Sequence, residues 1–280
     1  MTVEAAHPTA RRGLIGWREL LIWTSLFILA NTLAADLLAP HDASLGWNWL
    51  LQSRFGGFDA LAWAVGLYLL ARTRSRPAAA AELAGALGLC LLAALPQHMA
   101  PPLALTALAV WLFLNSRAEC RATAAIYLAI ASHQFWSYLL FQIFSPELVR
   151  VDAAMVGAAV ALTIKGAAWH DNTVAVPGGH AISILEACSS FSNVSTALLA
   201  WVALAKLERP RWVRRDVWVA AAAVLAQVGL NVARMYLLAL SEPLYAYWHD
   251  GAGAQIYAAA ASAAAVFIAV FGTRWAADAA

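Results

Sequence analysis

The sequence has little charge, and the charges it has are nearly balanced. Only 12% of its 280 residues are Asp, Glu, Lys or Arg, and the formal net charge is +2. It has no basic stripe with interleaved aromatic residues, so we set aside a nucleic-acid partner. Hydrophobic residues make up 62% of the chain, and the mean hydropathy is +0.67. This composition lies outside the range of soluble globular proteins and predicts an integral membrane protein.

Cysteines and metal-binding motifs are also scarce. The three cysteines, Cys90, Cys120 and Cys188, are widely spaced and form no CxxC pair, so their spacing indicates neither a disulfide framework nor a metal site. The sequence contains no HExxH motif, no Gly-x-Ser motif and no paired acids, which argues against the metal, serine and glutamate classes of intramembrane protease. We therefore expect no metal and no cofactor.

Apolar segments are plentiful instead. Nine of them run through the chain, at residues 20–38, 58–71, 83–95, 102–115, 122–144, 151–168, 187–205, 217–240 and 254–272. A helix needs about 20 residues to cross a bilayer, so the shorter segments are marginal. Because no internal repeat and no large soluble insertion interrupts them, we expect a single domain over residues 1–280.

Basic residues predict the orientation of these segments. They gather at residues 72–76, around Arg117 and Arg121, at residues 206–215 and at Arg274. The positive-inside rule places these clusters and the N-terminus in the cytoplasm, which requires an even number of crossings. We expect residues 151–168 not to cross, because they contain Lys165 and follow a turn-like Ser-Pro-Glu. The sequence thus predicts an all-α helical bundle with about eight transmembrane helices and both termini in the cytoplasm.

Three chemically distinctive residues are expected at the outer ends of the last helices. The basic loop 206–215 fixes the inner ends of the two helices that flank it. Cys188 then begins one helix outside, Arg234 lies in the outer part of the next, and His249 lies in the following loop. A neighbouring Arg or protonated His favours the thiolate form of a cysteine, which attacks carbonyl groups. An Arg can also hold an oxyanion, and a His can give a leaving amine its proton.

Each of these residues also has a simpler explanation. Small polar residues recur along the Cys188 helix at the spacing of a helix face, as Cys188, Ser192 and Ser195 and as Ser189, Asn193 and Thr196. Such stripes are common where membrane helices pack closely, and a lone cysteine is usually a small packing residue. Arg234 shares a face with Gln227 and Asn231, and could extend its charge to the membrane surface. His249 could be a solvated histidine in a polar loop.

Three short motifs follow one another in the last third of the chain. They are Glu-Ala-Cys-Ser-Ser at residues 186–190, Asn-Val-Ala-Arg at residues 231–234, and His249 followed by Gly253. In order and helix context they resemble the exosortase/archaeosortase family of membrane transpeptidases, whose motifs read roughly A-C-S-G, N-x-x-R and H-x-x-x-G. Ser190 stands where the family usually has Gly. The resemblance covers residues 165–272, and residues 1–150 match only as a generic, variable helical bundle.

The resemblance implies a set of roles. Cys188 would be the nucleophile, Arg234 the clamp for an oxyanion or substrate, and His249 the acid and base. The residues expected to support them or to bind substrate are Glu186, Ser189, Ser190, Asn231 and Gly253. His180, eight residues before Cys188, is the next candidate base.

The family is thought to act on exported proteins whose C-terminal tail carries a short signal, a membrane helix and a basic end, as in PEP-CTERM proteins. The resemblance therefore implies a multi-pass protein of the inner membrane whose active site faces the non-cytoplasmic side. The acceptor is unknown, and both hydrolysis and transfer stay open. The alternative function is a membrane transporter or a nonenzymatic scaffold in which Arg234 lines a polar path. That alternative predicts internal repeats and broken midplane helices, and the sequence shows neither.

Overall fold

The computed structural model describes residues 15–38, 55–114, 118–185 and 188–277. The helices of the first half are α1 (Trp17–Leu38), α2 (Gly57–Ala71), α3 (Ala80–Ala93), α4 (Ala100–Phe113) and α5 (Ala118–Ala131). A π-helical segment, η2 (Ser132–Trp136), continues α5 into α6 (Ser137–Ala161). Three strands follow, β1 (Ala168–His170), β2 (Thr173–Ala175) and β3 (Ala181–Ser183). The last helices are α7 (Ser190–Glu208), α8 (Asp216–Leu240), α9 (Glu242–His249) and α10 (Ala252–Ala277).

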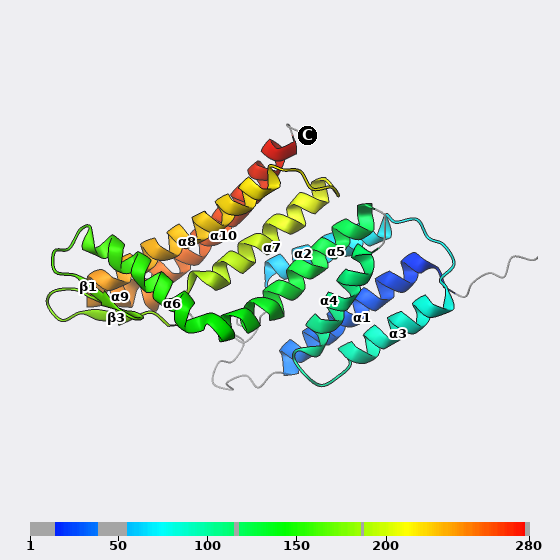
Figure 1. Ribbon diagram of the computed structural model, residues 1–280, viewed down its shortest axis with the longest axis horizontal. Coiled ribbons are helices and arrows are strands. Elements are labelled where there is room, and N and C mark those ends of the chain that lie inside the picture. Colours follow the sequence, from blue (N-terminus) through cyan, green and yellow to red (C-terminus); the bar gives the residue numbers. More distant parts are fainter. Residues whose placement is uncertain (1–14, 39–54, 115–117, 186–187, 278–280) are drawn as a thin grey trace, which may run out of the picture.

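Helix α7 joins two groups of helices. The first group contains α1 to α5, and the second contains α6, α8, α9, α10 and the strands (Figure 1). Helix α7 packs against α2 and α5 of the first group and against α8 and α10 of the second. Its first turn lies near the strands and α9, whereas its last turn leads into the basic loop before α8. A residue near the start of α7 is therefore surrounded mainly by the second group.

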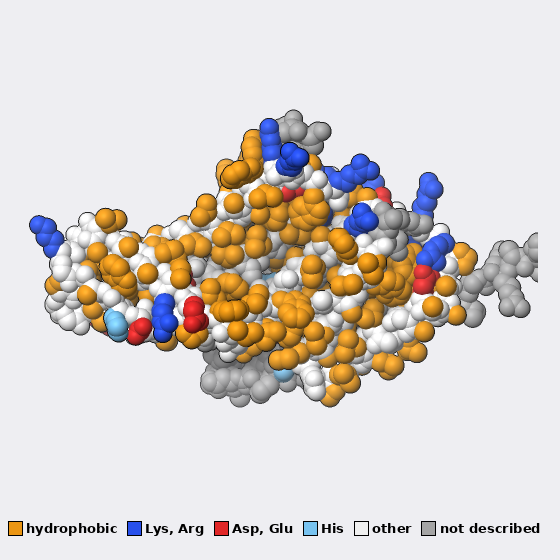
Figure 2. Space-filling model, viewed as in Figure 1, with side chains coloured by type: hydrophobic (Ala, Val, Ile, Leu, Met, Phe, Trp, Pro, Cys, Tyr) orange, Lys and Arg blue, Asp and Glu red, His pale blue; other side chains and the backbone are white. Residues whose placement is uncertain are grey.

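The helices have the length and surface of membrane spans. In the described part of the chain, four helices are long and apolar enough to cross a bilayer: α1, α7, α8 and α10. Helices α2, α3 and α4 are apolar but shorter. Figure 2 shows a surface covered largely by hydrophobic side chains, as lipid contact requires. The prediction of an all-α integral membrane protein is confirmed, whereas eight crossings and cytoplasmic termini stay predictions.

The segment at residues 151–168 differs from its expected form. It is not a separate helix, because residues 151–161 are the second half of α6 and the chain then turns towards β1. Helix α6 bends at Phe144, whose φ of −114° and ψ of 15° are not helical, two residues before Pro146. A proline removes a backbone donor and crowds the preceding turn, which explains the bend at this place.

The polar approach to Cys188 forms a small sheet that the sequence did not predict. Strands β1, β2 and β3 pair antiparallel in that order. The turn between β2 and β3 contains Gly178 and Gly179, whose φ values of 105° and 92° suit glycine. Val174 and Ile182 are buried against α6 and α8. The sheet therefore covers the end of the second helix group, directly before the chain reaches Cys188.

Candidate active site

Cys188 lies in a single turn immediately before α7, and not within the helix as predicted. Its backbone N–H donates to the carbonyl of Leu185 at 2.9 Å. Ser189 is the N-cap of α7, and its hydroxyl accepts from the N–H of Phe191 at 3.3 Å. The half-buried Cys188 thus stands at the positive end of the α7 dipole, where a negative charge is favoured.

A buried carboxylate on α6 holds the residues that follow Cys188. Asp152 accepts from the Ser189 hydroxyl at 2.7 Å, from the Ser190 hydroxyl at 2.6 Å and from the Ser190 N–H at 3.2 Å. All three residues are buried. The Ser190 hydroxyl, which a glycine would lack, therefore has a defined partner. Sequence reasoning missed Asp152, although a lone acid in an apolar segment was a signal that could have found it.

An amide on α8 holds the carbonyl of Cys188 itself. The Nδ2 of Asn231 donates to that carbonyl at 2.9 Å, and the Oδ1 of Asn231 accepts from the hydroxyl of Tyr257 at 3.1 Å. Asn193 of α7 donates to the same hydroxyl at 2.7 Å. Gln227 belongs to the same predicted stripe but donates instead to the carbonyl of Ala261 on α10. Helices α7, α8 and α10 are therefore linked by hydrogen bonds beside Cys188.

Arg234 lies one turn after Asn231 on α8 and has two defined contacts. Its Nε donates to the carbonyl of Trp248 at 3.3 Å, and its guanidinium carbon lies 4.8 Å from the centre of the Tyr257 ring. The contact with Trp248 connects α8 to the end of α9, one residue before His249. These contacts hold the guanidinium within the protein, so it is not simply a charge extended to the membrane surface.

His249 is the last residue of α9 and is partly exposed. Its Nδ1 lies 2.8 Å from the Oδ1 of Asp250, and its ring stacks on Tyr245 with centroids 4.9 Å apart. His180, the other candidate base, contacts the same Tyr245 edge-on, with ring centroids 6.3 Å apart. The Nε2 of His180 lies 2.9 Å from the carbonyl of Leu238, which can only accept. One nitrogen of His180 is therefore engaged by the backbone.

The structure brings the elements that carry Cys188, Arg234 and His249 to one end of the molecule. Asn231 connects the Cys188 backbone to α8, and Arg234 connects α8 to the residue before His249. Within the described ranges, no hydrogen bond or ion pair joins the three side chains directly. We call the residues linked here the Cys188 cluster: Cys188, Asp152, Ser189, Ser190, Asn193, Asn231, Arg234, His249 and Tyr257.

Two further predicted residues have different outcomes. Gly253 lies in the first turn of α10, and a Cβ added there would approach ring atoms of Tyr247 and Trp248 to 2.8 Å. The absence of a side chain thus lets α9 pack closely on α10. Glu186 lies outside the described residues.

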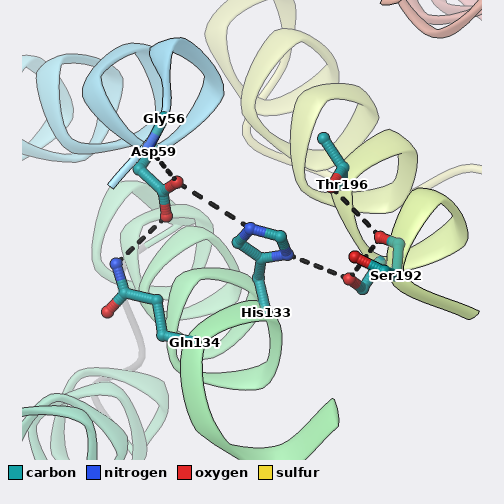
Figure 3. Close-up of polar contacts among 7 residues, drawn as sticks. Gly56, Asp59, His133, Gln134, Ser192 and Thr196 are labelled. Atoms are coloured by element: carbon teal, nitrogen blue, oxygen red, sulfur yellow. Dashed lines mark hydrogen bonds and ion pairs between the residues drawn. The ribbon is translucent and has the colours of Figure 1, made fainter. Parts of the chain in front are cut away.

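A second polar cluster lies between α2, η2 and α7 and was not predicted (Figure 3). Asp59 of α2 is 1% exposed and accepts from the Gly56 N–H and from the side chain of Gln134, both at 3.0 Å. The imidazole of His133 stands between this carboxylate, 3.8 Å from Nε2, and the Ser195 hydroxyl, 2.9 Å from Nδ1. We call these residues of three elements, Asp59, His133, Gln134 and Ser195, the Asp59 cluster.

The Asp59 cluster has the residue types of a serine triad but a different bonding pattern. The Ser195 hydroxyl donates to the carbonyl of Ser192 at 2.8 Å, so its proton is directed away from His133. The Nδ1 of His133 is then the donor to Ser195, and its Nε2 faces Asp59. This pattern connects helices and does not activate the hydroxyl. A histidine and an acid in apolar segments were the sequence signals for it.

A cavity of about 470 Å³ lies beside the first turns of α7, from Phe191 onward, and reaches the Asp59 cluster. Its walls come from the first turns of α7 and from η2 and α6, with Phe191, Ser192, Thr196 and Gln142 among the lining residues. The cavity therefore offers a partly polar space one turn beyond the cysteine.

Comparison with known proteins agrees with this arrangement. The profile of a family described as transmembrane exosortase matches residues 43–267, which include every motif named above. No curated protein and no solved structure matches the chain. The matched region is most of the chain, its described apolar segments are largely helical, and it contains Cys188, Arg234 and His249 in order. The chain belongs to the transmembrane exosortase family.

Proposed function

We propose that the protein is a membrane-embedded cysteine protease or transpeptidase that removes a C-terminal sorting signal from exported proteins. Membership of the exosortase family suggests a role in processing sorting signals. The observation that carries the proposal is the hydrogen bond from Asn231 to the Cys188 carbonyl. It places the helix of Arg234 beside the cysteine, as a shared site requires.

The first half-reaction forms a thioester. The Cys188 thiolate attacks the carbonyl carbon of the scissile peptide bond, and Arg234 binds the oxygen that becomes negative. Its Nε is held by the Trp248 carbonyl, and among the described residues no hydrogen bond engages its two terminal nitrogens. The C–N bond then breaks, and the membrane-anchored fragment leaves as an amine with a proton from His249.

The second half-reaction releases the exported protein. An amine or hydroxyl of the acceptor, or water, attacks the thioester, gives its proton to His249 and restores the Cys188 thiolate. Asp250 lies beside Nδ1 of His249 and supports this cycle, because a carboxylate there orients the ring. Proton transfer then uses the Nε2 atom, which no hydrogen bond engages among the described residues.

A trapped intermediate tests the chemistry. A His249→Ala variant should acylate slowly, because the thiol and Arg234 are retained, and should release its product poorly. With a reporter that carries a C-terminal signal, membrane helix and basic end, mass spectrometry should find a peptide thioester on Cys188. The matched control is the double variant His249→Ala, Cys188→Ala. An adduct on Cys90 or on no cysteine would contradict the proposal, and a transporter would show no adduct in either variant.

We also place the protein in the inner membrane with Cys188 on the non-cytoplasmic side, in agreement with the basic loop at the opposite end of α7. In a variant whose only cysteine is Cys188, a membrane-impermeant maleimide should label intact spheroplasts. In a variant whose only cysteine is introduced by Arg214→Cys, labelling should require permeabilised membranes. The reverse pattern would invert the orientation.

A further inference from the structure

A second, larger groove lies along α5 and α7 and shares His133, Ser137 and Ser195 with the cavity described above. Its volume is about 1080 Å³, and most of its wall is apolar. The apolar lining includes Ala125, Leu128 and Ala129 of α5 and Leu198, Leu199 and Val202 of α7. The Asp59 cluster forms one end, where His133 and Ser195 line the groove.

The other end of the groove is basic. Arg121 of α5 and Arg211 of the loop between α7 and α8 both line it and are both exposed, and Trp212 lies beside them. The guanidinium of Arg121 lies 5.9 Å from the centre of the Phe113 ring. Indole rings favour the boundary between lipid tails and head groups. This end therefore has the composition of a membrane surface, and Figure 2 shows several Lys and Arg side chains along that upper edge.

Additional positive charge is buried behind Trp212. Lys206 is fully buried, and its Nζ lies 3.2 Å from the centre of the Trp212 ring. Among the described residues, neither this Nζ nor the Nε and Nη1 of Arg209 has a hydrogen-bond partner. The remaining nitrogen of that guanidinium, Nη2, donates to Asp216. Neither Lys206 nor Arg209 lines the groove, but their two positive charges face one carboxylate, Asp216, so the net positive charge behind Trp212 favours an anion at this end of the groove.

The dimensions of the groove match one lipid leaflet. From Arg121 to His133 the chain advances 12 residues, or roughly 18 Å at the rise of a helix. Half of a bilayer's hydrocarbon core is about 15 Å thick. A membrane-spanning helix about 30 Å long and 10–12 Å wide fills on the order of 2,400–3,400 Å³, well above the volume of this groove.

We propose that this groove binds an anionic phospholipid, with its phosphate between Arg121 and Arg211 and an acyl chain along α5 and α7. Basic pockets between membrane helices are suited to acidic head groups. A protein tail with a basic end would be repelled by the same residues, so charge favours the lipid over a sorting signal. The inference does not depend on Cys188 being a nucleophile.

Native mass spectrometry of the purified full-length protein tests the head-group contact. Phosphatidylglycerol and phosphatidylethanolamine with the same acyl chains are added, and the lipid retained is measured. The wild type should retain phosphatidylglycerol in preference. Arg121→Gln and Arg211→Gln should each weaken that retention about 5-fold and together about 25-fold, because each basic residue near an anionic head group contributes a similar factor.

The matched control is Arg214→Gln, which removes the same charge from an exposed residue of the same loop that does not line the groove. It should leave retention unchanged, and an equal loss in this variant would overturn the proposal. Ala129→Phe fills the apolar part of the groove and should displace the lipid while both arginines remain. Equal retention of the two lipids by the wild type, or retention unaffected by Ala129→Phe in a protein of unchanged thermal stability, would also overturn it.

Discussion

The two polar clusters that include residues at the start of α7 differ in which of their groups have defined partners. In the Asp59 cluster, both nitrogens of His133 and the Ser195 hydroxyl face defined partners, while the buried Oε1 of Gln134 has no hydrogen-bond partner among the described residues. In the Cys188 cluster, the backbone and the supporting side chains are bonded. Yet among the described residues no hydrogen bond engages the Cys188 thiol, the terminal nitrogens of Arg234 or the Nε2 of His249. A catalytic site needs groups that are free to bind substrate and are held in place by a rigid frame. A polar contact that only links helices does not need such groups.

The comparison predicts opposite results for two residues on the same stripe. Cys188→Ser should abolish turnover, because a hydroxyl is far less ionised than a thiol and Arg234 cannot compensate. Ser195→Ala should retain most turnover, because its hydroxyl only connects His133 to α7. Cleavage of a tailed reporter is measured in both variants, with immunoblots that confirm equal amounts in the membrane. Loss of turnover in Ser195→Ala at normal abundance would move the chemistry to the Asp59 cluster.

The free nitrogens of Arg234 are expected to have the next largest effect. Arg234→Lys keeps the charge but loses the two-pronged geometry, and we expect kcat/KM to fall about 10² to 10³-fold. The control is Arg150→Lys, since Arg150 is well exposed and pairs with Asp171 at 3.4 Å. Reporter cleavage by purified protein gives both values. Full activity in Arg234→Lys would reduce the arginine to a structural contact with Trp248.

The bonded character of the Asp59 cluster predicts a loss of stability without a loss of chemistry. Asp59→Asn keeps the shape of the side chain but removes the charge that faces His133, and should lower the free energy of unfolding by about 1–3 kcal/mol. Thermal unfolding in detergent measures this, with Asp171→Asn as an exposed control. Turnover per folded molecule should be close to that of the wild type. An unchanged stability with lost turnover would contradict the assignment.

The sequence predicted the helical membrane fold and the end of the bundle where Cys188, Arg234 and His249 lie. Long apolar runs and charged residues within them are strong local signals. The three strands before Cys188 were not predicted, because each has only three residues, too few to show the alternation typical of a strand. The sequence did not predict that the chain continues through a bend from the segment 122–144 into the segment 151–168, because Pro146 was interpreted as the end of a helix.

The partners within each cluster could not be predicted for a different reason. Asp152 lies 37 residues from Ser189, and Asp59 lies 75 residues from Gln134, so each contact depends on the packing of separate helices. A periodicity identifies which face of a helix is polar but not which helix it meets. Gln227 illustrates this, because it shares the face of Asn231 but donates to the backbone of α10, whereas Asn231 donates to the Cys188 carbonyl.

The smallest predicted effect concerns Ser190, which belongs to the Cys188 cluster but is fully bonded. Ser190→Gly introduces the residue of the motif that the sequence resembles and removes the side chain whose hydroxyl donates to Asp152. The bonds from the Ser189 hydroxyl and from the backbone of residue 190 remain, so Asp152 keeps two of its three donors. We expect a loss of about 1 kcal/mol in stability and a small change in kcat/KM, measured by thermal unfolding and reporter cleavage. Asp152→Ala, which leaves all three donors without their acceptor, should be more damaging on both measures. If Ser190→Gly instead changed kcat/KM strongly at unchanged stability, residue 190 would contact the substrate, and bonding alone would not separate frame from chemistry in this cluster.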